Sequence, residues 1–287
     1  MQILGCDFSS SPGRRKPIVI ARGRLGPEMR SVRLAELLGF ATLDSWGRWL
    51  ADERHTPWIG GFDMPFGLPR ELVETLGWPT DWQACMDHYA RLSRAQIREQ
   101  FKAFCAARPA GRKFAHRATD GPAGSSPSMK WVNPPVAYML HAGVPLLRAA
   151  GVHLPGLQPA PQQTPARVGL EAYPGQLARA VLGRRSYKSD DAARQTPERR
   201  QARQELIDAL KQDRAGLGLR LELTQAQRRA LEDDAKADAL DAVLCLLQAG
   251  WAACRRQEGD MLYGLPPGRD TLEGWIVTAG ALGGASH

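Results

Sequence analysis

The strongest constraint on the fold is the order of the segments near the N-terminus. Residues 2–10 (QILGCDFSS) form a strand-like run that ends in turn formers, and residues 18–25 and 28–37 continue as two more strand-like segments. Residues 41–53 then place apolar side chains at helical spacing, and residues 57–69 contain a buried strand closed by a loop rich in proline and glycine. The order strand–strand–strand–helix–strand predicts an α/β fold.

The next part of the chain, about residues 70–165, departs from this pattern. Its segments 70–78, 82–108 and 134–151 have helical composition. The loop at 116–135 is too long to be a simple connection in a compact domain. We therefore expect a largely helical insertion in the α/β core.

The core resumes after the insertion. Residues 167–175 (RVGLEAYPG) predict a strand with an abrupt end, and residues 194–213 predict a charged surface helix. The last strong element runs from about Thr224 to Arg256, and Thr224 with Gln227 predicts a capping box. We expect one domain over 1–287, composed of a core (about 1–70 and 166–256), the insertion (about 70–165) and an irregular tail (257–287).

Charge and cysteine content narrow the class of protein. The net charge is +8, which favours phosphate-bearing partners such as nucleic acid. The five cysteines include no CxxC pair, which predicts reduced thiols in a cytoplasmic protein. No signal peptide is visible, and the longest apolar run, residues 242–254, is too short to span a bilayer. Neither GxGxxG nor the P-loop pattern occurs, so neither nucleotide-binding motif is predicted.

Acidic residues stand at the ends of three predicted strands and on one predicted helix. Asp7 ends the first strand, Asp63 ends the strand after the first helix, and Glu171 ends a later strand. Asp238 and Asp241 lie three residues apart and therefore share one helix face. Ligands of open α/β sheets gather outside the carboxyl ends of the strands, so we expect these side chains to converge there.

Converging carboxylates repel one another and favour a hard cation such as Mg²⁺ or Mn²⁺. The predicted metal ligands are Asp7, Asp63, Asp238 and Asp241, while Glu171 joins them or positions a water molecule. Two such ions about 3.5–4 Å apart would activate water and stabilise the leaving oxygen in phosphodiester cleavage. Simpler interpretations exist for single residues, because an acid after a strand often forms a turn and a helical pair of acids is often a solvated face.

Several motifs resemble the domain-of-unknown-function family 429, which is described as predicted RNase H-like nucleases. The resemblance covers the chain from Ile3 to about Val277 and rests on GCDFSSSPGRRKPIVIARG, GFDMPFGLPR, HRATDGPAGSSPSMKWVNPP, EAYPG, DALDAVLCLLQA and LEGWIV. It implies an RNase H-like mixed sheet, with an antiparallel meander, a helix and then parallel strands.

In the RuvC-type members of that superfamily, acids lie on the first strand, on the fourth strand and twice on the last helix. Asp7, Asp63 and the pair Asp238 and Asp241 match that arrangement. Glu171 is an additional acid, and the segment from about 70 to 165 is an addition to the minimal fold.

Basic, hydroxyl and aromatic residues supply candidates for substrate binding. They are Ser9, Arg14, Arg15, Lys16, Lys130 and Trp131. The first four surround the turn after Asp7, where they could hold phosphate oxygens or form an exposed basic hairpin tip. The last two place a charge beside a stacking ring, which suits a single strand, although a buried loop anchor also explains the tryptophan.

The favoured hypothesis is a metal-dependent nuclease with Asp7, Asp63, Glu171, Asp238 and Asp241 as catalytic residues. Two alternatives remain open. One is an ATP- or phosphate-binding phosphotransferase of the actin and sugar-kinase type, which shares the general fold. The other is a non-catalytic nucleic-acid-binding protein that keeps the fold and the acids without turnover.

Overall fold

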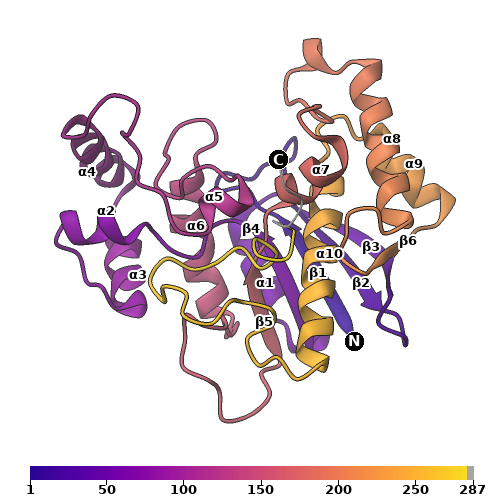
Figure 1. Cartoon of the computed structure of the whole chain (residues 1–287), viewed down its shortest axis with the longest axis horizontal. Helices are drawn as coiled ribbons and strands as arrows, with labels where there is room; N and C mark the ends of the chain where they lie inside the picture. Colours follow the sequence, from indigo (N-terminus) through magenta and orange to yellow (C-terminus); the bar gives the residue numbers. More distant parts are fainter. Residues whose placement is uncertain (283–287) are drawn as a thin grey trace.

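The computed structural model describes residues 1–282 and contains a six-stranded mixed sheet flanked by helices, which confirms the α/β prediction (Figure 1). The strand order is β5-β4-β1-β2-β3-β6. β1 pairs antiparallel with β2 and parallel with β4, β2 pairs antiparallel with β3, and both edge strands pair parallel with their neighbours. The strands are β1 (Gln2–Asp7), β2 (Ile18–Leu25), β3 (Ser31–Phe40), β4 (Trp58–Asp63), β5 (Arg167–Glu171) and β6 (Arg220–Glu222).

Helices follow the strands in three groups. α1 (Leu43–Ala51) and the short η1 (Glu53–His55) connect β3 to β4. The expected helical insertion between β4 and β5 contains α2 (Arg70–Thr75), α3 (Trp82–Arg91), α4 (Arg94–Ala106), α5 (Asp120–Ala123) and α6 (Val136–Ala149). The remaining helices are α7 (Pro174–Leu182), η2 (Ala192–Arg194), α8 (Pro197–Lys211), α9 (Gln225–Asp233) and α10 (Asp238–Gln257). No helix within residues 1–282 is both long enough and apolar enough to cross a membrane.

Two predicted helical segments are each divided in the structure. The segment 82–108 breaks at Ser93, which forms a capping box with Gln96 and starts α4. The element from Thr224 breaks after the predicted capping box of α9, which is present. Ala237 then has a left-handed φ of 59°, and the Asp234 carboxylate accepts a hydrogen bond from the backbone N–H of Ala239 at the start of α10. The Asp234 side chain therefore stabilises a sharp turn between α9 and α10. The apolar pattern of the sequence had predicted these two helices as one element.

The sheet separates two hydrophobic cores, because successive side chains of a strand point to opposite faces. Ile3 of β1 packs in the core formed with α7, α8 and α10. Leu4 packs in the other core, formed with α1 and the insertion helices α3, α4 and α6. Figure 1 shows α10 lying along the sheet, with the insertion extending away from it. The same alternation fixes which strand-end side chains can meet α10.

Helix α10 touches the sheet through glycine. A Cβ atom on Gly5 would lie 2.0 Å from the carbonyl oxygen of Ala242 and 2.1 Å from the backbone nitrogen of Leu246. A Cβ atom on Gly61 of β4 would lie 2.6 Å from the carbonyl oxygen of Cys245. Backbone therefore packs directly against backbone, and the position of α10 over β1 and β4 is tightly restricted.

The strand β6 was not predicted, and β3 begins and ends three residues later than its predicted segment 28–37. β6 is only three residues long and pairs with β3 at one edge of the sheet. So short a strand gives too little alternation for a sequence pattern to detect. Neither difference changes the central strands that carry the acids.

We predict that Gly5→Ala destabilises the protein by roughly 1–3 kcal/mol or more, because the added methyl group has no space against the α10 backbone. Urea unfolding measures the loss. Gly13→Ala is the matched control, since a Cβ atom there meets nothing within 4 Å. Equal stability of the two variants would contradict the close contact between strand and helix.

Candidate active site

Asp7 and Asp63 lie side by side at the ends of two neighbouring parallel strands. They are register partners in the pairing of β1 with β4. Both point to the face that α10 covers, because they lie two residues after Gly5 and Gly61 and side chains alternate along a strand. The ends of β1 and β4 therefore bring the two aspartates together, as the sequence predicted.

Asp241 approaches the same place from the first turn of α10. Its side chain is completely buried. The Tyr187 hydroxyl donates a hydrogen bond of 2.5 Å to its Oδ1 atom, and the Lys188 ammonium forms an ion pair with its Oδ2 atom. Tyr187 is itself held by the buried Arg203, whose guanidinium donates a hydrogen bond of 2.8 Å to the Tyr187 carbonyl oxygen. Asp241 thus has two partners from the segment after α7.

The carboxylates of Asp7 and Asp63 have no such partners. Among residues 1–282, no hydrogen bond or ion pair reaches either side chain. Burial, followed by repulsion from Asp241 and Asp63, raises the pKa of Asp7 well above its usual range. Burial and repulsion from Asp241 raise the pKa of Asp63 to about 7. The protein therefore disfavours ionisation of both carboxyl groups, and the nearby Lys188 charge offsets this only in part.

Asp7 and Asp63 line a cleft of about 730 Å³ whose walls carry charged residues of both signs. Asp7, Asp63 and Asp238 lie within it, and burial raises the pKa of Asp238. Four cationic side chains line the same cleft, namely Lys16, Arg94, Lys188 and Lys236. Lys16 pairs with Asp190 at 2.6 Å, so the rim is partly neutralised and partly free to meet an anion. The arrangement suits a polyanion whose phosphate approaches the carboxylates.

The helical insertion forms the far wall of the cleft. Arg94, the first residue of α4, donates a hydrogen bond of 2.6 Å to the carbonyl oxygen of Ser10, just after β1. Its guanidinium also lies 5.1 Å from the ring centroid of Tyr138 in α6, within range of a cation–π contact. The insertion therefore reaches back over the turn that follows Asp7 and narrows the approach to the acids.

Glu171 lies apart from the other acids. Its register partner is Phe62 rather than Asp63, and Phe62 belongs to the core on the opposite face of the sheet. The offset of one residue therefore turns the Glu171 side chain away from α10. Its carboxylate forms a two-point ion pair with Arg117 of the insertion, at 2.7 and 2.8 Å.

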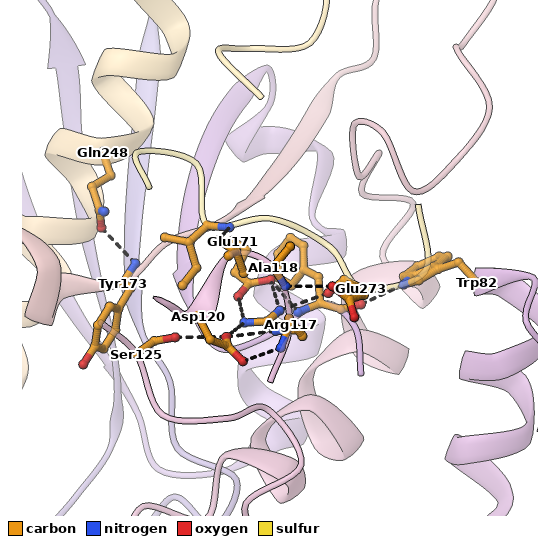
Figure 2. A network of polar contacts seen from close by, with 12 residues as sticks. Trp82, Arg117, Ala118, Asp120, Ser125, Glu171, Tyr173, Gln248 and Glu273 are labelled. Atoms are coloured by element: carbon orange, nitrogen blue, oxygen red, sulfur yellow. Dashed lines mark hydrogen bonds and ion pairs between the residues drawn. The ribbon is translucent and has the colours of Figure 1, made fainter. Parts of the chain in front are cut away.

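Arg117 is the centre of the buried polar network drawn in Figure 2. Besides Glu171, its guanidinium contacts the Asp120 carboxylate at 2.9 Å and the carbonyl oxygen of Glu273 at 3.1 Å. Glu171 also accepts a hydrogen bond of 2.9 Å from the backbone N–H of Phe66. Burial raises the pKa of Glu171, and the Arg117 charge opposes that rise. The network joins β5, the long insertion loop and the C-terminal tail.

The acids fit a divalent cation by chemistry, although they are not gathered into a finished site. Within the described residues, no three histidine, cysteine, aspartate or glutamate side chains are arranged to hold a metal ion. Asp7, Asp63 and Asp241 nevertheless supply hard oxygen atoms, and Asp7 and Asp63 form no ion pair within residues 1–282. In this structure the ammonium group of Lys188 forms an ion pair with Asp241 and neutralises its charge. These three residues, with Asp238 beside them, could hold the ion.

The predicted substrate-binding residues divide into three sets. Ser9 and Lys16 line the cleft. Arg14 and Arg15 lie at the exposed tip of the turn between β1 and β2. Lys130 and Trp131 do not line the cleft, and the Trp131 ring packs against Phe114 with centroids 5.8 Å apart, as expected of a loop anchor.

Sequence reasoning did not select Arg94, Lys188 or Lys236 for the site. Lys188 lies in the basic stretch GRRSYKS, whose composition resembles that of a solvated surface. Its partner Asp241 is 53 residues away in the chain, so no local spacing connects them. Tyr187, next to Lys188 in the sequence, was the one local indication of a site. A tyrosine beside a lysine can direct a hydroxyl group and a positive charge to the same carboxylate.

Comparison with known proteins places the chain in one family. The model of the family described as protein of unknown function DUF429 matches residues 5–267. The chain therefore belongs to this family, as its motifs predicted. Searches of curated proteins and of solved structures gave no match.

We predict that Asp63→Asn stabilises the metal-free protein at pH 8 by up to about 4 kcal/mol. With a folded pKa of about 7 against about 4 in the unfolded chain, wild-type Asp63 binds more protons when folded between these pH values. Its contribution to the free energy of unfolding therefore falls as pH rises from about 4 to 7. Asparagine removes this slope.

Urea unfolding from pH 4 to pH 8 in EDTA measures the effect of Asp63→Asn. Asp44→Asn is the control, because Asp44 is an exposed residue of α1 whose partner Arg48 is exposed too. Profiles of wild type and Asp63→Asn that run parallel would contradict the assigned pKa.

We predict that Arg117→Met destabilises the protein by about 3–5 kcal/mol, because it leaves two buried carboxylates, Glu171 and Asp120, without their cation. Arg48→Met is the matched control, since its exposed pair with Asp44 should contribute less than about 0.5 kcal/mol. Thermal and urea unfolding measure both. A loss in Arg117→Met as small as that in Arg48→Met would argue against a structural role for the network.

Proposed function

We propose that this chain is a divalent-cation-dependent hydrolase that cleaves phosphodiester bonds of nucleic acid. The observation that carries the proposal is the buried pair Asp7 and Asp63, which are adjacent in register, are repelled by Asp241 and form no ion pair among residues 1–282. They lie in a cleft that also contains four cationic side chains. Buried like charges are costly unless a cation joins them. Carboxylates that require a cation and lysines that attract phosphate together favour phosphoryl chemistry.

Asp7, Asp63 and Asp241 would hold Mg²⁺ or Mn²⁺, and Asp238, which lines the same cleft, would assist. When bound, such an ion lowers the pKa of a water molecule and polarises a phosphoryl oxygen. Lys16, Arg94 and Lys236 line the cleft and would bind and orient the phosphate backbone. Glu171 would act by positioning, because it anchors the insertion through Arg117 instead of facing the acids.

A second candidate function is supported by the two ion pairs of the site. Asp241 is neutralised by Lys188, and Glu171 is neutralised by Arg117. A site that supplies its own cation could bind nucleic acid without cleaving it. We also expect a cytoplasmic location, since all five cysteines are free thiols, which suits a reducing compartment.

The test is cleavage of labelled single-stranded DNA, duplex DNA, RNA and RNA–DNA hybrid in Mg²⁺, Mn²⁺, Ca²⁺ or EDTA. We predict that the wild type cleaves at least one of them in Mn²⁺ and that Asp7→Asn lowers the rate more than about 100-fold, since even outer-shell partners of a metal contribute 10–100-fold. Asp44→Asn, at an exposed position of α1 that does not line the cleft, should cleave at the wild-type rate. Circular dichroism checks that both variants fold.

Three outcomes separate the candidates. Full activity of Asp7→Asn would contradict the proposed role of the acids. Salt-sensitive binding without cleavage in any cation would favour the non-catalytic candidate. ATP binding with no affinity for nucleic acid would contradict both and favour a phosphotransferase.

A further inference from the structure

A second pocket, of about 320 Å³, opens beside the acids. It shares Asp63 and Lys188 with the cleft, and it also shares Pro134 and Met139 of the insertion. A molecule held in the cleft can therefore extend a neighbouring group into this pocket without leaving the carboxylates. Its volume is at the lower end for ligand pockets, which suits a group of one or two rings rather than a whole chain segment.

The walls of the pocket are largely apolar. Met64 after β4, Val136 and Met139 of α6, and Ile276 of the tail line it together with Tyr173. Figure 2 shows the Tyr173 ring beside Ser125 at one side of the Arg117 network. Flat apolar groups that enter such a pocket gain contact with thioether, aliphatic and aromatic surfaces at once.

The charged groups at the inner end do not favour an anion. Arg117 is saturated by the carboxylates of Glu171 and Asp120, so that these three groups together carry a net negative charge. Lys188, the other cation that lines the pocket, is paired with Asp241, so a phosphate would meet no unpaired cation there among the described residues. Arg94 and Lys236, which form no ion pair within residues 1–282, lie instead on the cleft side. The two cavities therefore differ in chemistry: four cationic and four acidic side chains line the cleft, whereas mainly apolar side chains line the pocket.

We propose that this pocket binds one nucleobase of the substrate strand while the adjoining phosphate lies at the acids. The inference rests on the proposed function and extends it, because only an unpaired base can leave the strand and enter a side pocket. A base is neutral, has apolar faces and has a polar edge. The substrate class that follows is single-stranded nucleic acid, or a duplex with an unpaired nucleotide.

Two serines can meet the polar edge of the base. Ser125 and Ser126 line the pocket and are half-buried. The Ser125 hydroxyl donates a hydrogen bond of 3.0 Å to Asp120, so its oxygen atom remains available to accept from an amino group. The segment PAGSSPS of the long insertion loop would therefore supply hydrogen-bonding groups to the bound base.

The test compares binding of a short single-stranded oligonucleotide with a series in which one abasic position moves along the strand. Fluorescence anisotropy in Ca²⁺ gives each affinity. We expect one abasic position, and not the others, to weaken wild-type binding by about tenfold, as for loss of one stacked base. Val136→Trp fills the pocket and should weaken binding of the intact strand by about the same factor. The affinity of Val136→Trp should not fall further when the strand carries that abasic position, because the pocket and the base act together.

Val132→Trp is the matched control, because Val132 is 52% exposed in the same loop region and does not line the pocket. It should bind like the wild type. If Val136→Trp fails to fold, Ser126→Trp fills the same pocket from the loop and should give the same result.

The outcomes distinguish this inference from the proposed function. The base pocket would be overturned if no abasic position weakened binding by the wild type, or if Val136→Trp bound the intact strand as tightly as the wild type. The nuclease proposal would still stand in both cases. Absence of both binding and cleavage for every nucleic acid would overturn the proposed function and this inference with it. A free nucleoside monophosphate that binds as tightly as the strand, with affinity lost in Val136→Trp, would support the pocket and overturn a nucleic-acid strand as its ligand.

Discussion

The contact between the backbone of α10 and the backbones of β1 and β4 is the constraint on which the site depends. Gly5 and Gly61 leave no side chain between strand and helix, so the distance is set by peptide groups alone. Each glycine is followed two residues later by an aspartate on the same face. The close approach that requires glycine therefore also delivers Asp7 and Asp63 to the first turn of the helix, where Asp241 lies.

Charge is distributed unequally around the two faces of the sheet. On the insertion side, Glu171 receives an arginine and a backbone N–H, and the acid serves to join distant segments. On the α10 side, Asp241 forms an ion pair with Lys188, whereas Asp7 and Asp63 form none among residues 1–282. The charge of Asp63, its register partner, helps to raise the pKa of Asp7. One set of buried acids is thus satisfied by the fold and stabilises it. The other is held in a state that a further cation would relieve.

Much of this arrangement could be predicted from the sequence, since Asp7, Asp63 and Asp241 follow clear strand and helix patterns. The role of Glu171 could not, because a short buried strand does not reveal whether its last residue pairs with Asp63 or with Phe62. The pairing of Lys188 with Asp241 could not be predicted either, because it joins segments that are distant in the chain, although the tyrosine next to Lys188 gave a weak local signal. Pattern reasoning locates the ends of elements, whereas register and long-range pairing decide which ends face each other.

The C-terminal tail extends the folding unit beyond the boundary that family similarity defines. The family match ends at residue 267, but Glu273 accepts hydrogen bonds from the backbone N–H groups of Arg70 and Ala118, and Val277 donates one to the carbonyl oxygen of Glu171. A chain shortened to the matched region would lose the segment that closes the network over Arg117. Relatives compared only over that region would therefore be compared without one wall of the pocket.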